Sequence, residues 1–154
     1  MGILSIFSNK KEFFSAEEKQ RIVEAIRLAE RATSGEIRVF VESKNPYVEP
    51  LERAAEVFFK LKMEHTENRN AVLLYIAMAH HELALFGDEG IYKALGKAFW
   101  ENEVRHMITD FRGEHVVDGI VDCVGHIGQA LKEKFPYESS TDKNELPDEI
   151  IFGH

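Results

Sequence analysis

Residues 71–90 of this 154-residue chain are AVLLYIAMAHHELALFGDEG, and the predicted fold depends on this stretch. Residues 71–78 are almost wholly apolar, which is typical of a central strand covered on both faces. His80 and His81 form a turn, and residues 82–86 form the next strand. Because the turn is short, the two strands are predicted to pair as an antiparallel hairpin.

The hairpin is followed by Gly87-Asp88-Glu89-Gly90, which holds two adjacent carboxylates between two glycines. Glycine adopts backbone angles that other residues avoid, so this stretch predicts a tight strand-to-helix turn. Such a turn would bring the oxygens of Asp88 and Glu89 into one small volume, and hard divalent cations prefer clustered carboxylate oxygens. The alternative is that Asp88 only caps the following helix and Glu89 is solvated.

The segments before the hairpin predict two helices and a strand. Ser15 and Glu18 fit a capping box that begins a helix, and Gly35 would end that helix as its C-cap. In residues 36–42 the aliphatic Ile37, Val39 and Val41 alternate with Arg38, Phe40 and Glu42, as in a strand with one strongly buried face. A second helix is predicted from residue 51 to about residue 67. Because this helix separates two strands, those strands are predicted to be parallel, with a right-handed crossover.

The segments after the acidic turn are predicted to be helical. Their expected bounds are 91–95, about 97–111 and about 115–135. Gly119, Gly125 and Gly128 lie in the last helix, where glycine costs about 1 kcal/mol relative to alanine, so they indicate close approach to a neighbouring element. Without the short piece at 91–95, the expected order is α-β-α-β-β-α-α, which predicts an α/β fold with a small mixed sheet between two helical layers.

The chain is predicted to contain one domain at residues 13–136, after an N-terminal extension at 1–12. Residues 137–154 are polar and lack periodicity, which predicts an extended C-terminal tail. The apolar residues through which this tail would pack back onto the domain are Leu146, Ile150 and Ile151.

Composition excludes several classes of protein. A formal net charge of −8 argues against a nucleic-acid binder and against docking on anionic membranes. The single cysteine cannot form an internal disulfide, and no apolar run has the roughly 18 residues of a membrane span. The expectation is a cytoplasmic, monomeric protein with no membrane span, whose protein partner, if it has one, is unidentified.

The predicted topology brings distant carboxylates together. The end of an antiparallel third strand lies beside the starts of the first and second strands, so Asp88 and Glu89 should lie near Glu36. The turn that opens the last helix would close over the same end with Asp118. The predicted metal site is therefore Asp88, Glu89, Glu36 and Asp118, and no catalytic residue is assigned.

Two histidine–carboxylate pairs offer a different kind of metal site. His106 and Asp110 are four residues apart on one predicted helix, as are Asp122 and His126 on the next. Such a pair can ligate a transition metal, but it is more often a surface interaction of about 0.3 kcal/mol. A zinc site is therefore the less favoured interpretation. Cys123, between these residues, is interpreted as a small buried hydrophobe.

Four motifs, in order, resemble the TPM domain over residues 13–136. They are TSGEIRV at 33–39, NAVLLYIA at 70–77, FGDEGI at 86–91 and GEHVVDG at 113–119. The terminal NELPDEI at 144–150 resembles the tail of short bacterial members. The resemblance implies a Rossmann-like α/β/α sandwich with a divalent-cation site, calcium being favoured over magnesium. Members of the family are associated with acid phosphatase activity or with upkeep of photosynthetic complexes, and others have no clear activity, so the resemblance by itself does not assign catalysis.

The chain departs from the family pattern at two places. Ala79-His80 stands where many members have an acidic residue, and Asp88-Glu89 stands where many have Tyr-Gly. Histidine is a poor calcium ligand, so whether His80 replaces an acidic ligand is an open question. The favoured interpretation is a TPM-like domain that binds a divalent cation through carboxylates, without robust catalysis. The alternatives are a metal-dependent acid phosphatase, which would be a hydrolase of phosphomonoesters, and a metal-free protein-interaction domain.

Overall fold

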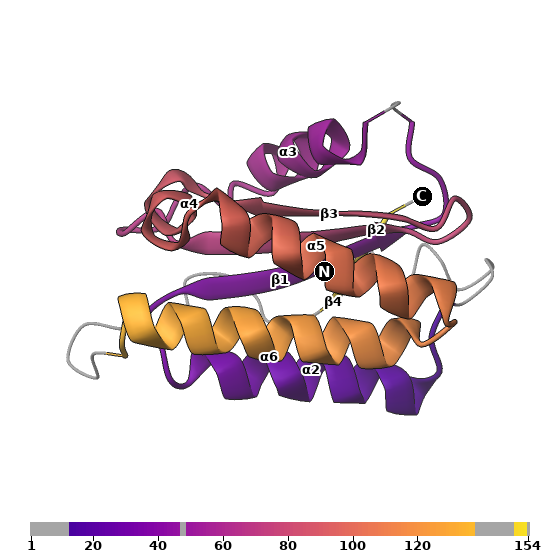
Figure 1. The fold of residues 1–154 in the computed structure, drawn as a ribbon, viewed down its shortest axis with the longest axis horizontal. Helices are drawn as coiled ribbons and strands as arrows, with labels where there is room; N and C mark the ends of the chain where they lie inside the picture. Colours follow the sequence, from indigo (N-terminus) through magenta and orange to yellow (C-terminus); the bar gives the residue numbers. More distant parts are fainter. Residues whose placement is uncertain (1–12, 47–48, 138–149, 154) are drawn as a thin grey trace.

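A computed structural model describes residues 13–46, 49–137 and 150–153, in which four strands form one mixed sheet in the order β3-β2-β1-β4 (Figure 1). The strands are β1 (Glu36–Glu42), β2 (Ala71–Ala77), β3 (Glu82–Gly87) and β4 (Ile150–Phe152). β1 is parallel to both β2 and β4, and β2 is antiparallel to β3. The predicted parallel pair and the predicted hairpin are both confirmed.

Helices cover both faces of this sheet, so the fold is the predicted α/β/α sandwich (Figure 1). In the described residues they are α2 (Ala16–Glu30), α3 (Pro50–Lys60), α4 (Glu89–Leu95), α5 (Lys97–Arg112) and α6 (Val116–Lys134). α3 packs on one face, against β2 and β3. α2, α5 and α6 pack side by side on the other face, where α6 contacts both of its neighbours.

The alternation of side chains along β2 divides the interior into two cores. Val72, Leu74 and Ile76 belong to the larger core beneath α2, α5 and α6. Leu73 and Tyr75 point the other way, into the smaller core beneath α3. Because successive strand residues face opposite sides, a strand that is apolar at every position needs a layer on each face. This is why the run at 71–78 predicts a central strand correctly.

The end of the chain contributes a strand that sequence patterning does not reveal. Ile150 and Ile151, predicted to pack back onto the domain, are buried at 4% and 1% exposure as part of β4. Phe152, the last residue of β4, stacks on Phe13 with ring centroids 6.4 Å apart. Leu146 lies outside the described residues. A strand of three residues is too short for a recognisable period, so only the pairing with β1 identifies it.

Two predicted helix ends are wrong for local reasons. α2 begins with the predicted capping box of Ser15 and Glu18, but it ends at Glu30 rather than at Gly35. Gly35 is needed for packing, because a Cβ there would lie 2.6 Å from a methyl carbon of Leu131. α3 ends at Lys60 rather than near residue 67, since Lys62 has a positive φ of 58° and the Met63 amide donates to the Phe58 carbonyl at 3.0 Å.

The glycines of α6 confirm two of three predicted close approaches. A Cβ at Gly119 would lie 2.8 Å from the Cβ of Asp110 on α5, and one at Gly128 would lie 2.6 Å from the Cβ of Ala29 on α2. These two glycines let α6 approach both neighbouring helices. Gly125 is different, because a Cβ there would have no described atom within 4 Å and the residue faces solvent.

A buried polar network joins the sheet to α3. Glu42, at the end of β1, is 2% exposed, and its carboxylate accepts hydrogen bonds from Arg53 Nε at 2.8 Å and Arg53 Nη2 at 2.9 Å. The Tyr75 hydroxyl donates to the same carboxylate at 2.5 Å. Burial, and then the hydrogen bond to Glu42, raise the pKa of Tyr75 above its usual range.

The raised pKa of Tyr75 predicts a loss of stability at alkaline pH. Above about pH 10 the unfolded chain releases the Tyr75 proton while the folded protein retains it, so the free energy of unfolding falls by about 1.4 kcal/mol per pH unit. Below about pH 10 this contribution is fully present. Urea denaturation of wild type and Tyr75→Phe between about pH 9 and 11 measures how the free energy of unfolding changes with pH. The slope of Tyr75→Phe should be the shallower one, by a difference that grows from near zero at about pH 9 toward that amount at about pH 11. Equal slopes in the two proteins would contradict the prediction.

Candidate functional site

Asp88 lies at the predicted strand-to-helix turn, but cationic and amide donors already surround its carboxylate. Arg69 Nε donates to Asp88 Oδ2 at 2.7 Å, Arg69 Nη2 donates to Oδ1 at 2.8 Å, and Oδ1 also accepts from the Glu89 amide at 2.9 Å. Asp88 is 3% exposed and is the N-cap of α4. The hydrogen bonds to Asp88 are also the largest cause of the raised pKa of Arg69. Capping and ion pairing therefore account for this buried carboxylate.

Glu36 lies at the same edge of the sheet, as the predicted topology requires. It is the first residue of β1 and pairs in register with Ala71, the first residue of β2. The Asp88 amide donates to the Ala71 carbonyl at 2.9 Å, so the β3 end, the β1 start and the β2 start are adjacent. Glu36 is 3% exposed, whereas the side chain of Glu89 is 61% exposed. The structure brings Asp88, Glu89 and Glu36 to one edge.

Asp118 lies at the opposite edge of the sheet, away from the other three predicted ligands. Its carboxylate pairs with Arg21 at 2.8 Å, and both side chains are more than half exposed. Asp118 and Arg21 line a hollow together with Met78, which follows the last residue of β2. A seven-residue strand spans about 20 Å, so Asp118 is too far from Asp88 to share an ion with it. The reason is α5, whose 16 residues carry the chain back along the sheet before α6 begins.

His80 also lies at that opposite edge, in the β2–β3 turn. Its Nδ1 is 3.8 Å from Glu82 Oε1, and its side chain is 45% exposed. His80 therefore cannot complete a metal site together with Asp88, because β3 separates the two residues.

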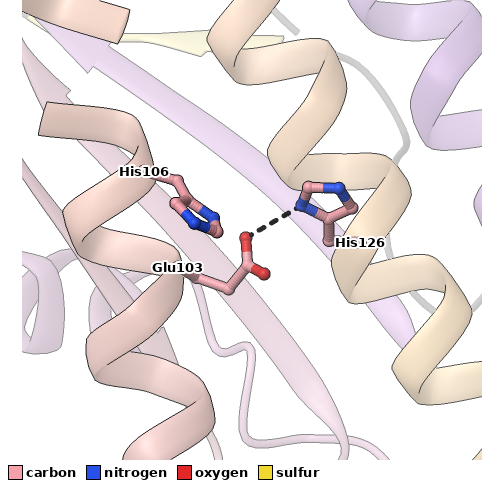
Figure 2. Close-up of side chains that lie close together, drawn as sticks. All are labelled: Glu103, His106 and His126. Carbon is pink, nitrogen blue, oxygen red and sulfur yellow. Dashed lines mark hydrogen bonds and ion pairs between the residues drawn. The ribbon is translucent and has the colours of Figure 1, made fainter. Parts of the chain in front are cut away.

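A different set of metal-capable side chains meets where α5 packs on α6. Glu103 and His106 project from α5 toward His126 on α6 (Figure 2). One ligand atom from each residue lies within 4.8 Å of the other two. The Oε2 of Glu103 is 3.2 Å from the Nδ1 of His126, and the rings of His106 and His126 have centroids 6.4 Å apart. Glu103 is 7% exposed, whereas both histidines are exposed.

We call the surface between these helices the α5–α6 groove; it is a hollow of about 270 Å³ lined by the three side chains and by Asp110 and Asp122. Close packing of Gly119 on Asp110 sets the distance between the two helices. Three carboxylates around two imidazoles make the groove attractive to a cation. Imidazole and carboxylate together are a donor set that zinc and related ions use in proteins.

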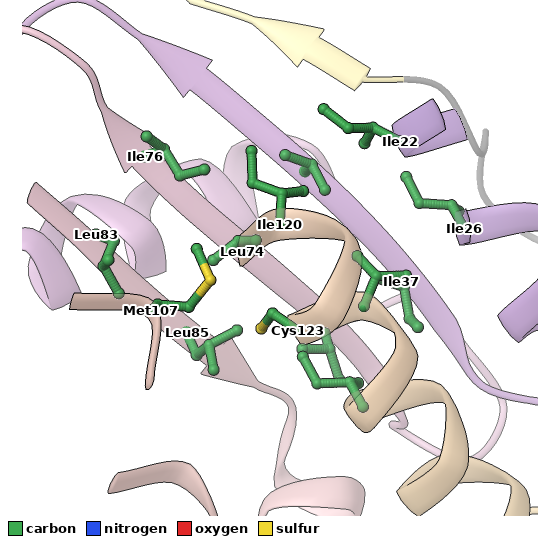
Figure 3. Packing of buried hydrophobic residues seen from close by; sticks show 14 of the residues in the cluster. Ile22, Ile26, Ile37, Leu74, Ile76, Leu83, Leu85, Met107, Ile120 and Cys123 are labelled. Atoms are coloured by element: carbon green, nitrogen blue, oxygen red, sulfur yellow. The ribbon is translucent and has the colours of Figure 1, made fainter. Parts of the chain in front are cut away.

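Cys123 lines the α5–α6 groove but is not among the three residues whose ligand atoms converge there. Figure 3 shows it among apolar core side chains such as Leu74 and Met107, and it is 2% exposed. Burial raises the pKa of the Cys123 thiol well above its usual range, and the charges of Glu103, Asp110 and Asp122 raise it further. The thiol therefore stays protonated, in agreement with its interpretation as a small buried hydrophobe.

The spacing of Glu103 and His106 in the sequence already indicates this cluster, but the pair predicted from the sequence is His106 with Asp110 instead. Glu103 and His106 form a Glu-x-x-His pair, which places a carboxylate and an imidazole on one face of a helix. The aspartates four residues from each histidine, Asp110 and Asp122, line the same groove but do not belong to the group of ligand atoms that converge within 4.8 Å. That His126 faces Glu103 across 23 residues of sequence is visible only in the tertiary structure.

Comparisons with known proteins agree with this fold. The family model described as TPM domain matches residues 8–130. An NMR structure of the BA42 protein from the psychrophilic bacterium Bizionia argentinensis is 38% identical, with a TM-score of 0.86, covering 94% of this chain and 98% of that one. No curated protein matches the chain. In the part of the chain that the structure describes, no helix combines the length and apolarity needed to cross a bilayer.

Two more distant structures share the fold alone. The N-terminal domain of a protein from P. gingivalis is 20% identical with a TM-score of 0.60, covering 79% of this chain and 78% of that one. The N-terminal domain of the cg2496 protein from Corynebacterium glutamicum is 10% identical with a TM-score of 0.57, covering 96% of this chain and 84% of that one.

Proposed function

This chain belongs to the TPM-domain family, and we propose that it is a divalent-metal-binding domain whose ion lies in the α5–α6 groove. The observation that carries the proposal is the convergence of Glu103, His106 and His126, whose ligand atoms lie within 4.8 Å of one another. The ligands come from two helices, so a bound ion would link α5 to α6. An ion that binds only the folded protein stabilises it.

A second candidate is the carboxylate site at the start of α4, with calcium as its ion. Asp88 and Glu36 are buried at 3% exposure, and Glu89 adjoins Asp88, which favours this site. Against it, Arg69 holds both oxygens of Asp88, so a cation would have to displace a guanidinium from two hydrogen bonds. The α5–α6 groove requires no such displacement of an arginine, so it is the stronger candidate.

A metal-dependent phosphatase is the catalytic alternative. A metal ion could hold a phosphomonoester and lower the pKa of a bound water. The carboxylates of Glu103, Asp110 and Asp122 would repel a dianionic phosphate from the α5–α6 groove. The arrangement therefore supports metal binding without robust catalysis. Hydrolysis of p-nitrophenyl phosphate that depends on Glu103 would favour the phosphatase instead.

Glu103→Gln is expected to weaken metal binding at least about tenfold, because it removes the one anionic ligand of the cluster. Amide ¹H–¹⁵N spectra titrated in turn with zinc, magnesium and calcium would measure both affinity and location. The largest chemical-shift changes are expected for amides of α5 and α6 around His106 and His126.

Glu101→Gln is the matched control on the same helix. Glu101 is exposed and pairs with Lys97 at 3.9 Å, so its replacement should leave the titration unchanged. Chemical-shift changes confined to Asp88 and Glu89 would show that the ion binds at the second candidate site instead. Spectra that respond to none of the three ions would rule out a metal-binding function.

A further inference from the structure

We propose that the ion of the α5–α6 groove is a nitrogen-preferring transition-metal ion of the zinc class, held by three protein ligands with one coordination position open to solvent. This inference rests on the proposed metal-binding function and identifies the class of ion. The ion proposed here differs from calcium, the ion that the family resemblance implies, because two of the three ligands are imidazoles.

The donor set separates the two classes of ion. Calcium and magnesium are hard cations that take oxygen ligands, and imidazole is a poor substitute for oxygen in their coordination. Zinc and its neighbours in the first transition row bind imidazole nitrogen and carboxylate oxygen together. Glu103, His106 and His126 therefore form a two-nitrogen, one-carboxylate set of the kind found in zinc enzymes.

The distances also fit one ion. Ligand atoms about 2.0–2.1 Å from a tetrahedral ion lie about 3.3 Å from one another. Glu103 Oε2 and His126 Nδ1 are already 3.2 Å apart, so both atoms could contact one ion with little movement. A ring nitrogen of the third ligand, His106, lies within 4.8 Å of a ligand atom of each of the other two residues, and its exposed side chain can change rotamer to approach an ion.

The two sides of the cluster differ in burial, and this difference leaves one coordination position of the ion open to solvent. Glu103 is 7% exposed and is fixed by packing between the helices, so it anchors the ion from below. His106 and His126 are exposed at the mouth of the α5–α6 groove. A four-coordinate ion with three protein ligands would bind water or a small anion at its solvent side. Asp110 and Asp122, which line the groove, would accept hydrogen bonds from such a water.

Thermal melting of metal-free protein tests the class of ion. Zinc at about 100 times its dissociation constant should raise the Tm by roughly 5–10 °C, and EDTA should reverse the rise. Calcium and magnesium at the same free concentration should leave the Tm unchanged. His106→Ala and His126→Ala should each lower the zinc affinity by at least about tenfold, whereas His65→Ala, at an exposed histidine outside the cluster, should not.

The outcomes separate this inference from the proposed function. If no ion changes the Tm, the proposed metal-binding function is wrong. If calcium or magnesium raises the Tm as much as zinc does, the proposed metal-binding function stands and the zinc-class assignment is wrong. If zinc acts equally on both histidine variants and on wild type, the ion does not lie in the α5–α6 groove, and both the proposed location and this inference are wrong.

Cobalt(II) tests the open coordination position. The visible spectrum of bound cobalt reports its coordination, and azide should change it by occupying the free position. A spectrum that azide leaves unaltered would show a closed coordination sphere and would overturn that part of the inference.

Discussion

Arg53→Met is expected to lower the free energy of unfolding by about 3–5 kcal/mol, because it leaves the buried Glu42 carboxylate without its cationic partner. Arg53 donates two hydrogen bonds to Glu42, at 2.8 and 2.9 Å, and also pairs with Glu56. The side chains of Arg53 and Glu42 are only 16% and 3% exposed, so water cannot replace the lost partner. Urea denaturation followed by circular dichroism measures the loss.

Arg21→Met is the matched control, because Arg21 also pairs with a carboxylate at 2.8 Å but both partners are more than half exposed. Its cost should be below about 1 kcal/mol. Adding Glu42→Gln to Arg53→Met should restore about 1–2 kcal/mol, since a neutral amide is easier to bury than a carboxylate. Equal losses for Arg53→Met and Arg21→Met would contradict this account of the network.

Gly90→Ala is expected to destabilise the protein by about 3 kcal/mol, although alanine is the better helix former. A Cβ at Gly90 would lie 2.3 Å from the Asn68 carbonyl oxygen and 2.7 Å from that of Arg69. Both obstacles are backbone atoms, so the first turn of α4 must move away from residues 68–69. That movement weakens the hydrogen bond from the Gly90 amide to the Arg69 carbonyl, which is 2.9 Å long.

Gly125→Ala is expected to change the free energy of unfolding in the opposite direction from Gly90→Ala. Within the described residues no atom lies within 4 Å of a Cβ at Gly125, and the residue lies inside α6, so alanine should stabilise by about 0.5–1 kcal/mol. Guanidinium denaturation of both variants compares the two changes. The prediction is wrong if the two substitutions change the free energy of unfolding in the same direction.

The sheet was predictable because its signals are local. The apolar run at 71–78, the short turn after it and the helix before it determine that β2 is central, pairs antiparallel with β3 and runs parallel to β1. Capping of α2 by Ser15 is also local, since both partners lie within one turn. β4 was not predictable, because three apolar residues carry no period and acquire their role only beside β1.

The residues of the candidate metal site were harder to predict, because their positions depend on where α5 ends. The topology correctly brings Asp88, Glu89 and Glu36 to one edge, since strand order alone decides which strand ends are adjacent. Asp118 was misplaced, because the length and direction of α5 carry the start of α6 to the far edge. Arg69, which donates to both carboxylate oxygens of Asp88, lies 19 residues before it in the sequence, so this ion pair is not a local signal.

Local sequence patterns were enough to establish the α/β/α layers, the hairpin and the parallel crossover, because hydrophobic period and turn chemistry act over a few residues. The resemblance to the TPM family rested separately on four short motifs in order. Which polar side chains meet depended on tertiary packing. Arg69 neutralises the acidic turn, and Glu103 faces His126 across two helices whose spacing Gly119 sets. Contacts of this kind depend on the angles and lengths of packed helices, which no short stretch of sequence encodes.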